Sequence, residues 1–152
     1  MLRGCIIDDI SIENNPGKLI QAILNGNITD EILEKSSKYT TTSREGGSIK
    51  ERVWEMCYLE EYLDTSDFIR IYEMQDFGSL IKADYFIEAS NSKRHTTVYI
   101  FIRKRMENEN YVVVSFFKKS NVYKGSSAYW MLKKKEYNGK SVELYRNPEY
   151  KE

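Results

Sequence analysis

The stretch Thr96–Lys119, which reads TTVYIFIRK, RMENEN and YVVVSFFKK, decides the fold of this 152-residue chain. Two runs rich in β-branched and aromatic residues flank a short polar connection. Side chains alternate between the two faces of a strand. The expected faces are Val98, Ile100 and Ile102 against Tyr99, Phe101 and Arg103 on the first run, and Val112, Val114 and Phe116 against Val113, Ser115 and Phe117 on the second. Because both faces are largely apolar, we expect two central strands of an antiparallel sheet, covered by helix on at least one side and joined by a loop of about four or five residues.

The length and composition predict one domain, with a helical part at about 16–63 and a sheet part at about 68–146. No apolar run approaches the roughly 20 residues that a membrane helix needs, and the start has no signal-peptide pattern. Cys5 and Cys57 form no CxxC pair, and His95 is the only histidine. We therefore expect a reduced, cytoplasmic protein that has no metal site and does not associate with membranes. The sequence does not indicate an oligomeric state.

The net charge of zero hides an uneven distribution of charged residues. Residues 1–90 carry 9 Lys and Arg against 17 Asp and Glu, a net charge of −8. Residues 91–152 carry 14 against 6, a net charge of +8. Either the two parts attract each other across the fold, or the basic part presents a phosphate-binding surface.

Two short helices are predicted near the start of the chain. Pro16 suits the first position of one helix, Asn15 its cap and Gly26 the position after its end. Thr29 suits the cap of the next helix, which has an acidic first turn. The apolar face of the first helix, which we expect to be buried, consists of Leu19, Ile20, Ile23 and Leu24.

The main helix is expected over residues 49–63, where a capping box formed by Ser48 and Glu51 opens it. At about 100° per residue, one apolar stripe is assigned to the sheet-facing side. This stripe consists of Ile49, Val53, Met56, Cys57 and Leu63. Glu60 falls inside it, so this carboxylate must reach a cation or lie where the helix leaves the core. A second, aromatic stripe, which we expect the N-terminal helices to bury, consists of Trp54, Tyr58 and Tyr62.

Further strands are predicted on both sides of the central hairpin. FIRIYEM and IKADYFIEA precede the hairpin, and SAYWMLKKKEY follows it. The pair Asn138-Gly139 then predicts a tight turn into SVELY. The order, with N-terminal helices packed on an antiparallel β-meander of about four to six strands, is that of an α+β fold.

The chemistry-bearing residues gather after the central hairpin. The sequence contains no Walker loop, dinucleotide fingerprint, GxSxG elbow, HExxH motif or EF-hand loop. His95 is expected in an exposed loop, with an acid–base role as the sharper alternative. A polar cluster lies within 21 positions: Ser115, Lys118, Lys119, Tyr123, Lys124, Ser126, Ser127, Lys133, Lys134 and Lys135.

Two interpretations of this cluster stay open. If strand 111–117 pairs with 128–136, several of its cations share one face, where they can bind a phosphodiester backbone while Tyr129 and Trp130 stack on bases. Mutual repulsion would also lower a lysine pKa and supply a base near neutral pH. Alternatively, the lysines guard a sheet edge against pairing with other chains.

The succession of segments resembles one known family. The helix with Arg52, then I-K-A-D-Y, V-Y-I-F-I, V-S-F-F and an L-K-K-K-E strand, is similar to the phage-type nucleases of the Barnase–EndoU–colicin–RelE-like fold, over about Ile20 to Tyr145. A Ser-Phe-Phe motif, a loop tyrosine and a Leu-rich strand ending in Lys-x-Lys are matched here by Ser115–Phe117, Tyr123 and Leu132–Lys135. The family's upstream Phe-x-His-Leu-x-Gly element is not found before Ile20.

The resemblance implies cleavage of single-stranded RNA in a bacterial host cell without metal or other cofactor, by attack of the ribose 2′-hydroxyl on the adjacent phosphate. Tyr123 would be the acid or base, Ser115 would position the substrate, and Lys133 would act on the phosphate. Lys118 and Lys119 would also lie on the phosphate, and Lys135 and Arg103 are the reserve RNA-binding residues.

The missing histidine element keeps two other classes open. One is a non-catalytic inhibitor from a phage or mobile element, such as an anti-CRISPR protein, that binds a host or rival defence protein. The other is an antitoxin-like or structural partner protein, whose contact surface would be the acidic N-terminal part. If cleavage needs the missing histidine, this chain is inactive or works differently.

Overall fold

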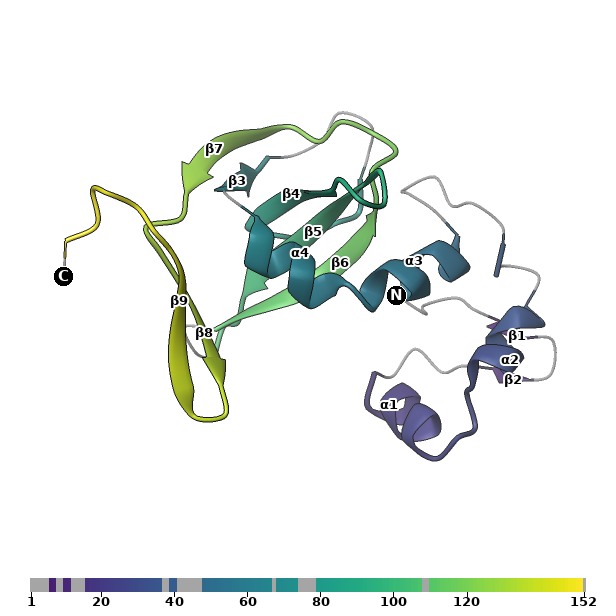
Figure 1. The fold of residues 1–152 in the computed structure, drawn as a ribbon. Helices are drawn as coiled ribbons and strands as arrows, with labels where there is room; N and C mark the ends of the chain where they lie inside the picture. Colours follow the sequence, from purple (N-terminus) through teal and green to yellow (C-terminus); the bar gives the residue numbers. More distant parts are fainter. Residues whose placement is uncertain are drawn as a thin grey trace.

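The chain builds an α+β fold in which helices precede an antiparallel sheet, as the sequence predicts (Figure 1). The computed structural model describes residues 6–7, 10–11, 16–36, 39–40, 48–66, 68–73, 79–107 and 110–151. The helices are α1 (Pro16–Leu24), α2 (Asp30–Glu34), α3 (Ile49–Met56) and α4 (Leu59–Thr65). The strands are β1 (Ile6–Ile7), β2 (Ile10–Ser11), β3 (Phe68–Tyr72), β4 (Tyr85–Asn91), β5 (Thr96–Lys104), β6 (Tyr111–Lys118), β7 (Gly125–Tyr129), β8 (Leu132–Tyr137) and β9 (Lys140–Arg146). Cys5 and the predicted cap Asn15 lie outside the described residues.

The main sheet has the strand order β6-β5-β4-β3-β7, and all of its neighbouring strands are antiparallel. The pairing of β5 with β6 confirms the predicted hairpin. However, β6 lies at an edge of the sheet and not in its centre. The chain crosses after β6 so that β7 pairs with β3 at the opposite edge. The pairing of 111–117 with 128–136, on which the shared lysine face depended, is therefore not formed.

The segment that the sequence predicts as one strand, SAYWMLKKKEY, is divided between two sheets. Its first part ends β7, and its second part is β8, which pairs with β9 in a separate hairpin that extends from the main sheet (Figure 1). Trp130 lies between the two strands and packs against the buried core, so the chain turns there. The predicted turn at Asn138-Gly139 is confirmed, with φ of 50° and 70°.

Two cores lie on opposite faces of the main sheet. The helix-side core contains Tyr62, Ile69, Ile87, Ala89, Val98, Ile100 and Phe116. The aromatic core contains Phe86, Tyr99, Phe101, Phe117 and Tyr123. The alternation predicted for the first run is confirmed, because Val98 and Ile100 lie in one core and Tyr99 and Phe101 in the other. On the second run it is wrong at Val114, which packs on the aromatic core because the register shifts beside Phe101.

The predicted main helix begins as expected and then breaks. Ser48 N donates to Glu51 Oε2 at 2.8 Å, and Glu51 N donates to Ser48 Oγ at 3.2 Å, which confirms the capping box. The helix is interrupted at Cys57 and Tyr58, between α3 and α4, so the continuous helix over 49–63 is wrong. The break changes the direction in which the following side chains point.

The buried face of this helical segment differs from the predicted stripe. Met56 and Leu63 pack on the helix-side core as predicted, but Cys57 is exposed. Tyr62, assigned to the other stripe, is only 1% exposed, whereas Trp54 is 62% exposed. The hydroxyl of Tyr62 donates to the buried carboxylate of Glu55 at 2.7 Å, a bond that the break makes possible.

The first helices also differ in part from the expectation. Thr29 caps α2 as predicted, through its contact with the N–H of Ile32. The buried face expected for α1 is wrong at Ile23 and Leu24, which are 45% and 72% exposed. No helix in the described part of the chain is long and apolar enough to cross a membrane.

Candidate functional site

The predicted lysines of β8 attach the β8–β9 hairpin to the end of α4. Lys133 Nζ donates to the main-chain oxygens of Asp64 and Ser66, both at 2.8 Å. Lys135 Nζ forms ion pairs of 2.6 Å with both Asp64 and Glu60. The contact of Glu60 with a cation confirms the expectation for that carboxylate. The structure therefore does not bring these two lysines together with the polar residues of β6.

Tyr123 lies inside the aromatic core. Its side chain is 4% exposed, and its ring centroid lies 5.0 Å from that of Phe101 and 5.1 Å from that of Tyr99, with both pairs edge to face. Edge-to-face aromatic pairs add to the stability that burial alone gives. The position closes the aromatic core on the side away from the helices. Its predicted role as acid or base stays untested.

A small pocket lies between α3 and the outer edge of β6. Its volume is about 120 Å³, which is room for a few water molecules or one compact group such as a phosphate. Arg52 and Ser115 are its strongly polar lining residues. The full lining consists of Arg52, Met56, Val113, Val114, Ser115 and Phe116. The edge position of β6 makes this pocket possible, because a further strand would occupy the place of α3.

The guanidinium group of Arg52 is held next to the aromatic core. Its central carbon lies 5.5 Å from the centroid of the Phe117 ring, a cation–π distance. Phe117 has 0% exposure, so the ring that holds Arg52 is itself fixed by packing. An arginine positioned in this way can present its planar donor fork to a phosphate.

A Glu–Lys pair extends the same face of the sheet. Lys119 follows β6 directly, and its N–H donates to the carbonyl oxygen of Thr97 at 2.8 Å. Its Nζ lies 2.5 Å from Glu88 Oε1 and 5.7 Å from the centroid of the Tyr99 ring. Glu88, Tyr99 and Phe117 form one row across β4, β5 and β6. The lysine thus lies at the polar end of the aromatic core.

The two ion-paired lysines are cations rather than bases. The hydrogen bond to Glu88 raises the pKa of Lys119 above its ordinary value. Hydrogen bonds to Asp64 and then Glu60 raise the pKa of Lys135 in the same way. The lowering of a lysine pKa by mutual repulsion is therefore wrong for both residues. Burial raises the pKa of Tyr99, which keeps its phenol protonated beside Lys119.

Arg52, Glu88, Ser115 and Lys119 together form what we call the β6-edge site. Ser115, Phe117 and Lys119 alternate along one strand, so Ser115 and Lys119 are separated by about 14 Å of extended chain. The site offers two cations, a hydroxyl and a carboxylate. Within the described ranges, no group of three or more His, Cys, Asp or Glu side chains is placed to hold a metal ion.

The other predicted residues lie around this site. Lys118 is exposed and points to the face opposite that of Lys119, because neighbouring residues of a strand alternate. Arg103 is exposed near the far end of the β5–β6 hairpin. His95 is exposed in the turn after β4, with φ of 50°, as expected for a loop histidine.

Two residues were not selected from the sequence, namely Glu88, which belongs to the site, and Tyr99, which lies beside it. Glu88 had a detectable signal, since it is a carboxylate flanked by the apolar residues Phe86, Ile87 and Ala89. Tyr99 could not be distinguished from the other aromatic residues of β5. Arg52 was indicated only by the family resemblance.

The comparisons with known proteins agree with that resemblance. The family model described as phage-Barnase-EndoU-ColicinE5/D-RelE like nuclease4 matches residues 2–149. No curated protein and no solved structure matches the chain. Because the match covers nearly the whole sequence, the chain belongs to this family of phage-Barnase-EndoU-ColicinE5/D-RelE like nucleases.

Proposed function

We propose that this protein cleaves single-stranded RNA at the β6-edge site without a metal ion. The observation that carries the proposal is that Arg52 and Ser115 line one pocket of phosphate size at the edge of β6. Lys119 follows β6 directly and reaches Glu88 on β4, two strands away from the edge. Membership of a nuclease family supports the same class of reaction. An origin in a phage or mobile element is part of the proposal.

Each residue of the site has a distinct role. Ser115 lies about 14 Å along the chain from Lys119, so Arg52 and Ser115 bind the phosphate next to the scissile one. Arg52 binds two of its oxygens through the donor fork, and the Ser115 hydroxyl donates to an oxygen of the same phosphate. Lys119, whose raised pKa keeps it protonated, offsets the negative charge that develops on the phosphate in the transition state. Glu88 accepts the proton of the ribose 2′-hydroxyl.

The reaction proceeds by displacement at phosphorus. The 2′-oxygen forms a bond to phosphorus while its proton passes to Glu88, and the bond from phosphorus to the 5′-oxygen breaks. The Lys119 ammonium group gives a proton to the leaving oxygen, and the products are a cyclic phosphate and a free 5′-hydroxyl. The direct contact between Glu88 and Lys119 then returns the proton to the lysine, which restores the starting state.

The remaining predicted residues support the site from a distance. Lys118 and Arg103 contact the RNA backbone from exposed positions on the hairpin. Lys133 and Lys135 hold the β8–β9 hairpin. For Tyr123 we propose a packing role, because its burial separates the hydroxyl from a substrate bound at the edge of β6.

One sequence observation favours a second function. The Phe-x-His-Leu-x-Gly element is not found before Ile20, so the chain can have kept RNA binding without cleavage. Under this alternative the protein is a non-catalytic phage or mobile-element inhibitor that binds a defence protein or its nucleoprotein complex. The β6-edge site would then be a binding surface only.

The test is cleavage of RNA by the purified protein in EDTA. Arg52→Ala is expected to lower the cleavage rate at limiting RNA by about 10–100-fold, because it removes a charge-assisted contact worth about 1.5–3 kcal/mol to the neighbouring phosphate. Ser115→Ala should have a smaller effect, and the matched charge control Lys140→Ala should have none. Product ends should be a cyclic phosphate and a 5′-hydroxyl. If wild-type protein leaves varied RNAs intact but blocks a defence system in cells, the second function replaces the first.

A further inference from the structure

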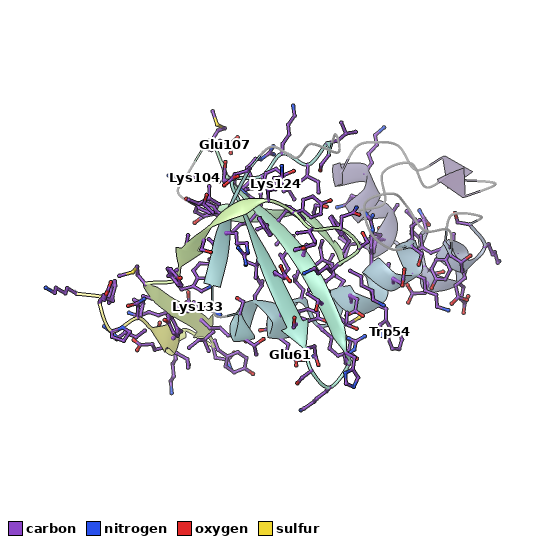
Figure 2. All side chains as sticks on the ribbon, turned by 90° about the horizontal axis from the view of Figure 1, so that it is seen from above. Trp54, Glu61, Lys104, Glu107, Lys124 and Lys133 are labelled. Atoms are coloured by element: carbon purple, nitrogen blue, oxygen red, sulfur yellow. The ribbon has the colours of Figure 1, made fainter. Side chains whose placement is uncertain are left out.

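A second recess adjoins the β6-edge site at the far end of the β5–β6 hairpin. We call it the hairpin groove, and its volume is about 1000 Å³. Its lining residues are Asp84, Arg103, Lys104, Arg105, Met106, Glu107, Val112 and Val113. Val113 also lines the pocket of Arg52 and Ser115, so the two recesses are neighbours along β6. Figure 2 shows Lys104 and Glu107 at one end of the sheet, with Trp54 and Glu61 at the other.

The charges of the hairpin groove favour an anion. Its three basic residues are consecutive and exposed, and its two carboxylates are Asp84 and Glu107. Asp84 Oδ2 already accepts the N–H of Lys104 at 2.7 Å, which partly offsets its negative charge. The lining keeps a formal charge of +1. Arginine side chains are suited to planar phosphate oxygens, because they present several donors in a fixed geometry.

Apolar side chains beside these cations remain in contact with water. Tyr111 is 46% exposed and Val113 is 40% exposed, and Met106 next to them is fully exposed. The ring of Tyr111 is held at its other side by Tyr85, at 5.8 Å between centroids. Tyr111 lies directly opposite Lys104 in the hairpin, at the margin of the groove. An exposed aromatic ring beside a cation is the usual combination in surfaces that bind unpaired nucleotides.

We infer that the hairpin groove and its margin bind the RNA nucleotides next to the pocket of Arg52 and Ser115, with Arg103 and Arg105 on the backbone and Tyr111, at the margin, against a base. This inference rests on the proposed function. Ser115 and Val112 are three residues apart on one strand, or about 10 Å, so one RNA strand reaches from the pocket into the groove. The substrate class is therefore RNA with several unpaired nucleotides around the cleavage point.

The test compares a short and a long RNA. Oligonucleotides of about four and about twelve nucleotides, within the range of single-strand site sizes, are labelled at one end and 2′-O-methylated so that they cannot be cut. Fluorescence anisotropy gives their affinities over a range of salt concentrations. The variant is Arg103→Ala with Arg105→Ala, and the matched control is Lys140→Ala with Lys151→Ala, which removes the same charge from exposed positions on β9 and the tail.

Wild-type protein is expected to bind the long RNA more tightly than the short one. In the arginine variant the ratio of long-RNA to short-RNA affinity should be about tenfold lower than in the wild type. The slope of log affinity against log salt concentration for the long RNA should become less steep by about 1.4, as expected for the loss of two single-strand phosphate contacts. The lysine control should keep the advantage. Thermal unfolding curves of both variants provide the check that they fold.

Two results would overturn the inference. One is an unchanged ratio of long-RNA to short-RNA affinity in the arginine variant, and the other is an equal fall of this ratio in the lysine control. Retention of RNA binding together with loss of a protein partner would assign the groove to protein contact. The proposed function fails separately, if wild-type protein binds long RNA with this length dependence but does not cut unmodified RNA.

Discussion

Replacing Glu88 by Gln separates a catalytic role of this carboxylate from a structural one. The substitution keeps the shape of the side chain and its ability to accept a hydrogen bond from Lys119, but it removes the charge and the proton acceptor. The pKa of Lys119 should then fall back toward its ordinary value, because the hydrogen bond to Glu88 is the largest cause of its increase. That ordinary value still leaves the lysine protonated at pH 7.

The expected effects on rate and affinity have opposite signs. Loss of a general base lowers the rate of cleavage by about 10²–10⁴. A phosphate on Lys119 would lie about 6 Å from Glu88, given the 2.5 Å ion pair and a second contact of similar length. At that distance, like charges repel by about 0.7 kcal/mol in water and more at lower dielectric. Because both side chains are partly exposed, 28% and 35%, we use the value for water and expect RNA to bind about threefold more tightly.

The assay combines single-turnover cleavage of unmodified RNA with anisotropy on a 2′-O-methylated copy. The stability cost of the substitution should be below about 1 kcal/mol, since partly exposed ion pairs contribute little. An unchanged cleavage rate would refute Glu88 as the base. A parallel loss of rate and affinity would show instead that the pair only maintains the local structure.

Three further substitutions test the packing. Tyr62→Phe should lower the free energy of unfolding by about 1.5–3 kcal/mol in urea titrations, since Glu55 loses a buried, charge-assisted hydrogen bond; a change below about 0.5 kcal/mol would contradict this. Tyr123→Phe should keep cleavage within a few-fold, and a hundredfold loss would restore its predicted role as proton donor. Gly125→Ala should destabilise the fold by at least about 1–3 kcal/mol, because the added Cβ would overlap the Phe86 ring; unchanged thermal stability would argue against this close approach.

The hairpin of β5 and β6 was predictable because its signal is local. Alternation of side chains defines both strands and assigns Tyr99 and Phe101 to one face. Val114 was misplaced because a bulge adds one residue to a strand without changing its composition. A period-two pattern cannot show where such an extra residue lies.

The position of β6 in the sheet was not predictable from this pattern. An apolar strand is expected in the centre of a sheet, but β6 lies at the edge because α3 covers it there. The deciding event is the pairing of β7 with β3, which depends on residues far apart in the sequence. The break after Met56 was missed for a similar reason, since it is stabilised by the bond between Tyr62 and Glu55.

The lysine cluster shows how non-local pairing changes a functional interpretation. Some residues of the basic part form ion pairs with the acidic part of the chain. Arg94 pairs with Glu55 at 3.0 Å, and Lys119 and Lys135 pair with carboxylates of the acidic part. The pairs of Arg94 and Lys135 offset cations that sequence density alone would assign to RNA, whereas Lys119 keeps its proposed role beside Glu88. An RNA surface is therefore expected where basic residues stay exposed, as Arg103 does in the hairpin groove, and not where lysines are most frequent along the chain.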